Sequence, residues 1–312
     1  MFHIWRAVHC SCGNGWGPNG ISRQTGAPVR DASALPETRD SSSGLQADAR
    51  SKFAIFVFVM LAFVWAWGAG FAATQVKAYS PGLNVALMIV AGFGPSLAGI
   101  AVVAFFSSPA GLRDWAGRCL NWRVGWRWFV LAFLAPPAVM VCALGLHAAL
   151  GGELPAWPAS GHIPLAIANF GFVLLIGGPL GEEFGWRGYL MPAITAHLNW
   201  RAASLVIGVV WGVWHLPLFF MAETAQSQMA IPVFMLNILA GSVLFGWLFE
   251  RTPGSVFPAL VLHTSLNAWA GMLAIVPTAA TGRPYALATA LLVLVAVALL
   301  LAPGRRPPIA AN

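Results

Sequence analysis

The sequence predicts an all-α fold, a polytopic membrane helical bundle of about eight transmembrane helices. Hydrophobic residues make up 58% of the 312 positions, and charged residues make up 9%. Soluble domains carry about 25% charged residues. In addition, the apolar residues fall in runs that can cross the roughly 30 Å hydrocarbon layer of a bilayer. A net charge of +7, gathered in a few connections and on no single face, argues against a nucleic-acid partner.

Three regions are expected along the chain. Residues 1–50 are rich in Gly, Ser, Ala and Pro, lack a helical or strand period and precede the first long apolar run. This composition predicts a disordered N-terminal tail. Residues 51–302 are expected to form one transmembrane domain, and residues 303–312 a short cytoplasmic tail.

The membrane domain divides into apolar segments of suitable length for single spans. The expected spans are Phe53–Ala73, Leu83–Ser107, Trp126–Leu150, Ile163–Leu180, Arg201–Phe220, Ile231–Phe249, Ser255–Val276 and Tyr285–Leu301. Within the second span, residues 91–99 read AGFGPSLAG, and such small residues allow helices to approach closely.

The positions of Lys and Arg predict the orientation, because cytoplasmic connections carry an excess of these residues. One side carries Arg50, Lys52, Arg113, Arg118, Arg123, Arg127, Arg305 and Arg306, and the other carries Lys77 and Arg283. Both termini are therefore expected in the cytoplasm. The high Ala, Gly, Trp and Arg content indicates the inner (plasma) membrane of a bacterium.

Charge enters the fourth apolar run at Leu180-Gly-Glu-Glu-Phe-Gly-Trp-Arg-Gly-Tyr189. An ionisable group at membrane depth is costly and marks a functional site by default. Glu182 and Glu183 are rotated by about 100° on a helix, so they face different targets. Arg187 lies four residues after Glu183, on the same face. We expect Glu182 to face a cavity, and Glu183 to pair with Arg187 as structural support.

Two later spans contain histidine in apolar surroundings, as Trp211-Gly-Val-Trp-His215 and His263-Thr-Ser-Leu-Asn267. Asn267 shares a helix face with His263. For these residues to meet Glu182, either the fifth span begins outside the bilayer or the fourth continues through Leu190. Both options predict a water-filled recess that opens to the cytoplasm, with Glu182 towards that side.

These residues resemble the motifs of the CPBP membrane proteases, the family that includes type II CAAX prenyl endopeptidases and Abi proteins. GEEFGWRG is similar to the family's EExxxR motif, Trp211-x-x-x-His215 to its second motif and His263-x-x-x-Asn267 to its third. The second motif usually has Phe where this chain has Trp211. Three motifs in the expected order, on separate apolar segments, are far more specific than one. The resemblance covers about Phe53–Leu301.

The resemblance implies an intramembrane endopeptidase that hydrolyses a peptide bond near the cytoplasmic membrane face. Glu182 would activate a water, His215 would help to position it, and His263 and Asn267 would stabilise the oxyanion. A desolvated glutamate can serve as a base near neutral pH, and Asn and His are common oxyanion donors. The implied partners are the lipid bilayer and a peptide or protein substrate, with prenylated and membrane-associated proteins as candidates.

The sequence leaves the cofactor and two other function classes open. Glu182, His215 and His263 are also a candidate zinc set, as in a metalloprotease, although HExxH is absent. The cofactor is thus either none or zinc. A proton-coupled transporter would also use intramembrane Glu and His, but the chain shows no repeated halves with matching broken helices. A catalytically silent scaffold would not need the complete motif set.

Overall fold

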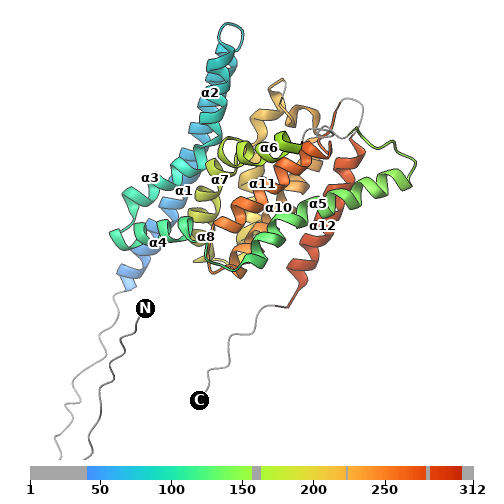
Figure 1. Ribbon diagram of the computed structural model, residues 1–312. Coiled ribbons are helices and arrows are strands. Elements are labelled where there is room, and N and C mark those ends of the chain that lie inside the picture. Colours follow the sequence, from blue (N-terminus) through green and yellow to red (C-terminus); the bar gives the residue numbers. More distant parts are fainter. Residues whose placement is uncertain (1–40, 157–162, 223, 279–281, 304–312) are drawn as a thin grey trace, which may run out of the picture. The chain divides into compact units, whose positions relative to one another are not determined.

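The computed structural model describes residues 41–156, 163–222, 224–278 and 282–303, and these residues form helices and connections without a β-strand (Figure 1). The chain divides into two units, Met1–Gly44 and Leu45–Asn312. Apart from the first residues of α1, the described helices belong to the second unit. Residues 1–40 of the expected N-terminal tail and 304–312 of the expected C-terminal tail lie outside the described residues. Residues 41–50 of that N-terminal tail are helical.

The helices follow one another along the whole described chain. They are α1 (Ser41–Val76), α2 (Pro81–Gly92), α3 (Gly94–Phe106), α4 (Pro109–Leu120), α5 (Trp126–Ala149), α6 (Ile163–Ile176), α7 (Pro179–Gly185), the π-helix η1 (Trp186–Leu190), α8 (Met191–Thr195), α9 (Trp200–Trp214), the 3₁₀ helices η2 (Leu216–Phe220) and η3 (Gln226–Gln228), α10 (Ile231–Arg251), α11 (Phe257–Met272) and α12 (Arg283–Leu301).

The expected all-helical membrane class is confirmed. Within the described residues, five helices are long and apolar enough to cross a membrane, and two bent pairs raise the count to as many as seven. The bent pairs are α2 with α3, at 49°, and the segments Pro164–Ile176 and Pro179–Thr195, at 41°. Helix α11 has 16 residues and occupies the remaining expected span. Helices therefore stand at all eight expected segments.

Glycine and proline cause the break in the fourth span. Gly178 has a φ of +112°, a conformation that side chains rarely adopt, and Pro179 begins α7 without needing a backbone hydrogen bond. Beyond this break the helix continues through η1 and α8 to Thr195. Of the two options that the sequence left open, the fourth span thus continues through Leu190. The break places the start of α7 inside the bundle.

Helices α3 and α7 pack with their backbones in contact. A Cβ atom on Gly185 would lie 2.1 Å from the carbonyl oxygen of Pro95, and one on Gly181 would lie 2.5 Å from that of Gly92. Ser96 Oγ also donates a hydrogen bond to the Leu180 carbonyl, at 2.9 Å. The close approach expected from the small residues at 91–99 is confirmed, and its partner is the helix that carries both glutamates.

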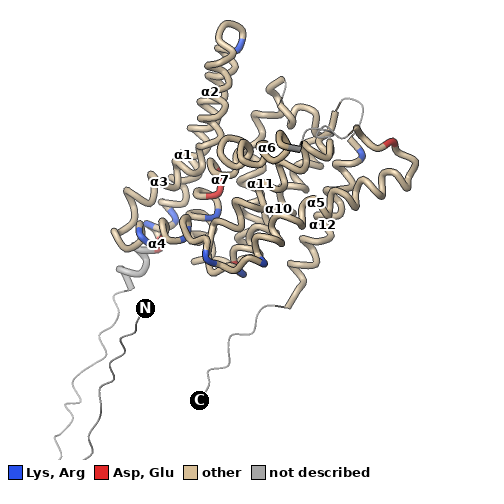
Figure 2. Tube along the Cα trace, in the orientation of Figure 1, with Lys and Arg blue, Asp and Glu red and all other residues tan. Residues whose placement is uncertain are grey.

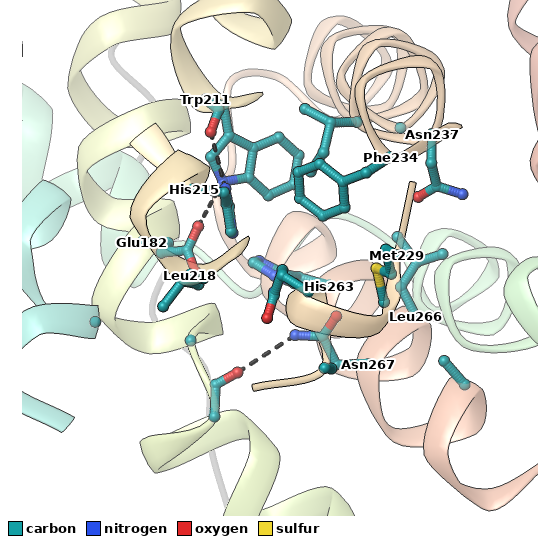
Figure 3. A pocket seen from close by; sticks show the side chains of 18 of the residues that line it. Glu182, Trp211, His215, Leu218, Met229, Phe234, Asn237, His263, Leu266 and Asn267 are labelled. Atoms are coloured by element: carbon teal, nitrogen blue, oxygen red, sulfur yellow. Dashed lines mark hydrogen bonds between the residues drawn. The ribbon is translucent and has the colours of Figure 1, made fainter. Parts of the chain in front are cut away.

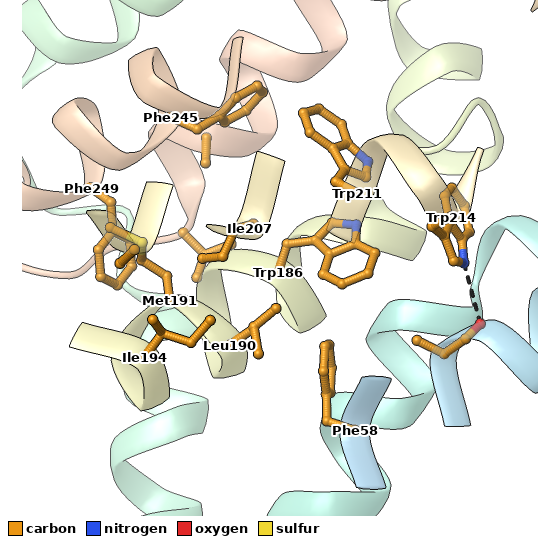
Figure 4. Close-up of a cluster of buried hydrophobic side chains, with 14 of the residues drawn as sticks. Phe58, Trp186, Leu190, Met191, Ile194, Ile207, Trp211, Trp214, Phe245 and Phe249 are labelled. Carbon is orange, nitrogen blue, oxygen red and sulfur yellow. Dashed lines mark hydrogen bonds between the residues drawn. The ribbon is translucent and has the colours of Figure 1, made fainter. Parts of the chain in front are cut away.

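A buried apolar cluster surrounds the next turn of this segment (Figure 4). Trp186 and Leu190 are fully buried and lie among Phe58 of α1, Ile207 of α9 and Phe245 of α10. The rings of Phe58 and Trp186 meet edge to face, with centroids 5.5 Å apart. This core holds the α7–η1 segment against three long helices, so the glutamates have a fixed place.

Helix α4 braces the same segment from the connection between α3 and α5. Arg118 donates to the carbonyl oxygen of Gly188 at 3.3 Å, and Trp115 Nε1 donates to that of Phe184 at 3.3 Å. Residues 109–120, which were expected as a connection between two spans, form this additional helix, which is not one of the candidate membrane spans.

Candidate active site

The structure brings all four expected catalytic residues to one cavity of about 460 Å³. Glu182, His215, His263 and Asn267 line it, and Figure 3 shows them grouped within it. They come from α7, from the residue after α9 and from two successive turns of α11. Segments that are far apart in the sequence therefore meet at one site.

Glu182 lies in the first turn of α7 and is 4% exposed. Its Oε2 atom accepts a hydrogen bond from Trp211 Nε1 at 2.6 Å and another from Trp186 Nε1 at 3.3 Å. Hydrogen bonds to an ionised acceptor are stronger than neutral ones. Two indoles thus fix this carboxylate, and its other oxygen, Oε1, lies towards Gly178, where a Cβ atom would be 2.8 Å away.

Glu183 lies behind the cavity lining and is fully buried. Its Oε1 atom is 3.1 Å from Arg187 Nη1, which is the ion pair expected from the sequence. The same oxygen is 2.8 Å from His263 Nδ1. Glu183 therefore supports both the arginine and a histidine of the site, a second contact that the sequence did not predict.

The histidine tautomers follow from these contacts. His215 Nδ1 is 2.8 Å from the carbonyl oxygen of Trp211, and a carbonyl can only accept, so Nδ1 carries the proton. His263 Nδ1 donates to the Glu183 carboxylate for the same reason. Each ring thus keeps its Nε2 atom for a water or a substrate.

Asn267 lies one turn beyond His263 and is exposed within the cavity. Its Nδ2 atom donates to the carbonyl oxygen of Gly177 at 3.3 Å, at the break between α6 and α7 (Figure 3). The amide can donate a second hydrogen bond, because its nitrogen carries two protons.

Arg187 is 1% exposed, and aromatic rings cover its guanidinium group. The guanidinium carbon lies 4.6 Å from the ring centroid of Trp211 and 4.0 Å from that of Phe245. Cation–π contacts of this kind stabilise a buried cation. Trp211 thus contacts Glu182 through its indole N–H and Arg187 through its ring face.

The roles of Trp186, Trp211 and Phe245 were not predicted from the sequence. One signal was available for Trp186, because it lies four residues after Glu182 and therefore on the same helix face. Trp211 was noted as the aromatic residue of the second motif, without its hydrogen bond to the acid. The contact made by Phe245 depends on how α10 packs, which no local spacing indicates.

Glu182, His215 and His263 stay a zinc set predicted from the sequence. Among the described residues, no group of three or more His, Cys, Asp or Glu side chains is arranged so that it could hold a metal ion. The Nδ1 atoms of His215 and His263 are hydrogen-bonded to protein oxygens, which is also the usual arrangement behind a metal-binding histidine, and both Nε2 atoms are left available. Because no such group is found among the described residues, we derive no step through a metal.

The position of the cavity disagrees with one expectation. Leu218, Ala225 and Met229, in the connection after α9, line the cavity. The N-terminal halves of α10, which begins at Ile231, and of α12, which begins at Arg283, also contribute to the lining. These parts lie at the ends of the helices opposite to Arg201 and Arg251. The sequence predicted that the recess opens to the cytoplasm, and also that the helix ends rich in Lys and Arg lie in the cytoplasm. Because the cavity lies at the opposite helix ends, these two predictions cannot both hold.

The helices and the buried polar cavity define an integral, multi-pass membrane protein with a site in its interior. Residues 164–269 match the family model described as Type II CAAX prenyl endopeptidase Rce1-like. This match agrees with the family resemblance that the motifs indicated. All four expected catalytic residues fall within the matched region.

A curated relative supports the same family. The protein named CAAX prenyl protease 2 from the archaeon Methanococcus maripaludis is 25% identical to this chain over 253 residues. The aligned residues cover 78% of this chain and 90% of the relative. The similarity thus extends well beyond the three motifs.

Proposed function

We propose that the chain is an endopeptidase in which the Glu182 carboxylate activates a water for attack on a peptide carbonyl. The observation that carries this proposal is the meeting of Glu182, His215, His263 and Asn267 around one cavity. A carboxylate, two imidazoles and an amide supply the base and the oxyanion donors that peptide hydrolysis needs.

The reaction begins with a water held between Glu182 and Nε2 of His215. Its oxygen forms a bond to the carbonyl carbon as its proton passes to Glu182. When the C–N bond breaks, Glu182 returns this proton to the leaving amine. The two indole donors fix the direction of the carboxylate, so little reorganisation is needed during the reaction.

The negative charge on the carbonyl oxygen requires donors on the other side of the cavity. Asn267 supplies an amide N–H, and His263 supplies an Nε2 proton when its ring is protonated. Glu183 stabilises that protonated ring through Nδ1. Loss of one oxyanion donor typically costs about 100-fold to 1000-fold in rate.

The substrate is a peptide or protein segment in or at the membrane. The archaeal relative is named as a CAAX prenyl protease, so prenylated proteins are candidates. The cavity lining is mostly apolar, as expected for a site reached within a bilayer. The bacterial plasma membrane stays a prediction from composition.

The test compares peptides released by membranes that contain wild-type protein or Glu182→Gln, using mass spectrometry. Glu182→Gln keeps the size of the side chain and removes the base, so we expect released fragments to disappear while the melting temperature in detergent stays the same. Equal release by both proteins would contradict the role of Glu182.

The same comparison with a zinc chelator separates the two mechanisms that the sequence left open. A glutamate base without metal predicts cleavage that the chelator does not change. Cleavage that is lost with the chelator and restored by zinc would replace this mechanism with a metal-held water.

A further inference from the structure

The cavity and the positive charge of the protein lie at opposite ends of the helices. We name as the arginine-rich end the helix ends that carry Arg50, Lys52, Arg113, Arg118, Arg123, Arg127, Arg201 and Arg251. Figure 2 shows most of this charge gathered along one side of the described helices. The opposite helix ends carry Lys77 and Arg283, and we call them the pocket end.

The cavity belongs to the pocket end. Its lining includes residues of the connection after α9, such as Pro217 and Met229, and residues from the first halves of α10 and α12, such as Phe234 and Tyr285. The lining residues of α9 lie near the C-terminal end of that helix and begin at Trp211. Those of α11 begin at His263, and the lining continues into the residues that follow this helix.

The arginine-rich end is separated from Glu182 by packed protein. Between Glu182 and Thr195 lie about 20 Å of helix at 1.5 Å per residue. Trp186, Leu190 and Met191 in this stretch are at most 1% exposed and belong to the main core (Figure 4). A substrate arriving from the arginine-rich end would have to disrupt this core.

Lys and Arg in short connections set the orientation of membrane proteins, with the positive side in the cytoplasm. The connections at the pocket end, 77–80, 150–162, 215–230 and 273–282, are all short enough for this rule. The asymmetry therefore places the pocket end on the non-cytoplasmic side of the membrane.

We propose that the site is reached from the non-cytoplasmic side, and that its substrates are peptide segments at that membrane face. That these segments are hydrolysed rests on the proposed function, whereas the orientation does not. Among the described residues that line the cavity, Glu182 is the only Asp, Glu, Lys or Arg. The site therefore suits uncharged segments, because a buried charge without a partner is costly.

The orientation is tested by labelling single cysteines in the full chain with a membrane-impermeant maleimide. Cys10, Cys12 and Cys142 are replaced by serine. Cys119 is kept because it is buried, and burial raises the pKa of its thiol to about 12, which leaves little reactive thiolate at neutral pH.

The reporters are Ala225→Cys and Gly82→Cys at the pocket end, with Gly117→Cys in α4 at the arginine-rich end as the matched control. All three positions are exposed, and a Cβ atom on Gly82 or Gly117 would meet no other atom within 4 Å. In intact cells we expect about 10-fold more labelling at both pocket-end positions than at Gly117→Cys. Inside-out vesicles should show the reverse.

Labelling of Gly117→Cys and protection of both pocket-end positions in intact cells would overturn the proposal, as would equal labelling at both ends. Peptide release that depends on Glu182 is measured in parallel. If that release persists with the opposite orientation, the proposed function stands and this inference fails. If the expected orientation is found without such release, the proposed hydrolysis fails, and with it the assignment of these segments as substrates.

Discussion

At the scale of single residues, the site depends on how two adjacent glutamates are separated. Glu182 faces the cavity and is held by two indoles, while Glu183 faces the protein and binds Arg187 and His263. The rotation of about 100° between neighbouring helix residues produces this division. It follows that the two acids should respond differently to the same substitution.

Replacing Trp211 by Phe should lower the turnover number. The ring would still pack against Arg187, but Glu182 would lose the hydrogen bond at 2.6 Å. A hydrogen bond to a charged group contributes about 1.5–3 kcal/mol, so kcat should fall by about 10-fold to 100-fold. Steady-state kinetics would measure kcat and KM separately, and KM should change little.

The matched control for this prediction is Trp214→Phe. Trp214 also lines the cavity, but its indole donates to the carbonyl oxygen of Ala62 rather than to Glu182. A turnover number for Trp211→Phe that equals the wild-type value, or a loss that Trp214→Phe reproduces, would show that the hydrogen bond to Glu182 does not matter.

Replacing Glu183 by Gln should lower stability as well as activity. The change leaves the buried Arg187 cation without its counter-ion, and removal of one partner of a buried pair costs about 3–5 kcal/mol. Glu182→Gln in the neighbouring position is the control and should keep the wild-type melting temperature. If Glu183→Gln had wild-type stability and no activity, the supporting role assigned to Glu183 would be wrong.

The sequence identified the four cavity residues and the Glu183–Arg187 pair, because motif spacing and helix periodicity determine them locally. It did not identify the Trp211 hydrogen bond, since the direction of an indole depends on the rotation of α9 against α7. The contact between His263 and Glu183 was missed for the same reason, because it joins residues 80 positions apart.

At the scale of helices, the fixed contact between α3 and α7 places the acids. Glycine at Gly181 and Gly185 allows the two backbones to touch. The sequence predicted that residues 91–99 would pack closely, but it could not indicate which helix they meet. It also missed α4, because a short helix that carries two arginines and an aspartate does not resemble a membrane span.

Replacing Gly185 by Ala should destabilise the protein strongly. The added Cβ atom would lie 2.1 Å from the Pro95 carbonyl oxygen, so α3 and α7 would have to separate. Overpacking of this kind costs about 1–3 kcal/mol or more. Thermal unfolding in detergent would measure the change. Gly171→Ala in α6 is the control, since a Cβ atom there meets nothing within 4 Å, and equal melting temperatures for both variants would refute the close contact.

At the scale of the whole membrane domain, the sequence predicted the helical class and the side on which Lys and Arg gather. It did not predict where the cavity lies. Helix lengths alone left Glu182 near the cytoplasmic surface, because the continuation of the fourth span through η1 and α8 could not be distinguished from a loop. That continuation puts Glu182 deep in the bundle and the cavity at the pocket end.

The most direct test of the account is peptide release in water enriched in ¹⁸O, measured by mass spectrometry on membranes with wild-type protein or Glu182→Gln. Attack by a water that Glu182 activates predicts fragments whose new carboxyl terminus carries one ¹⁸O atom, and predicts that Glu182→Gln produces none. Labelled fragments released equally by both proteins would contradict the central role of Glu182.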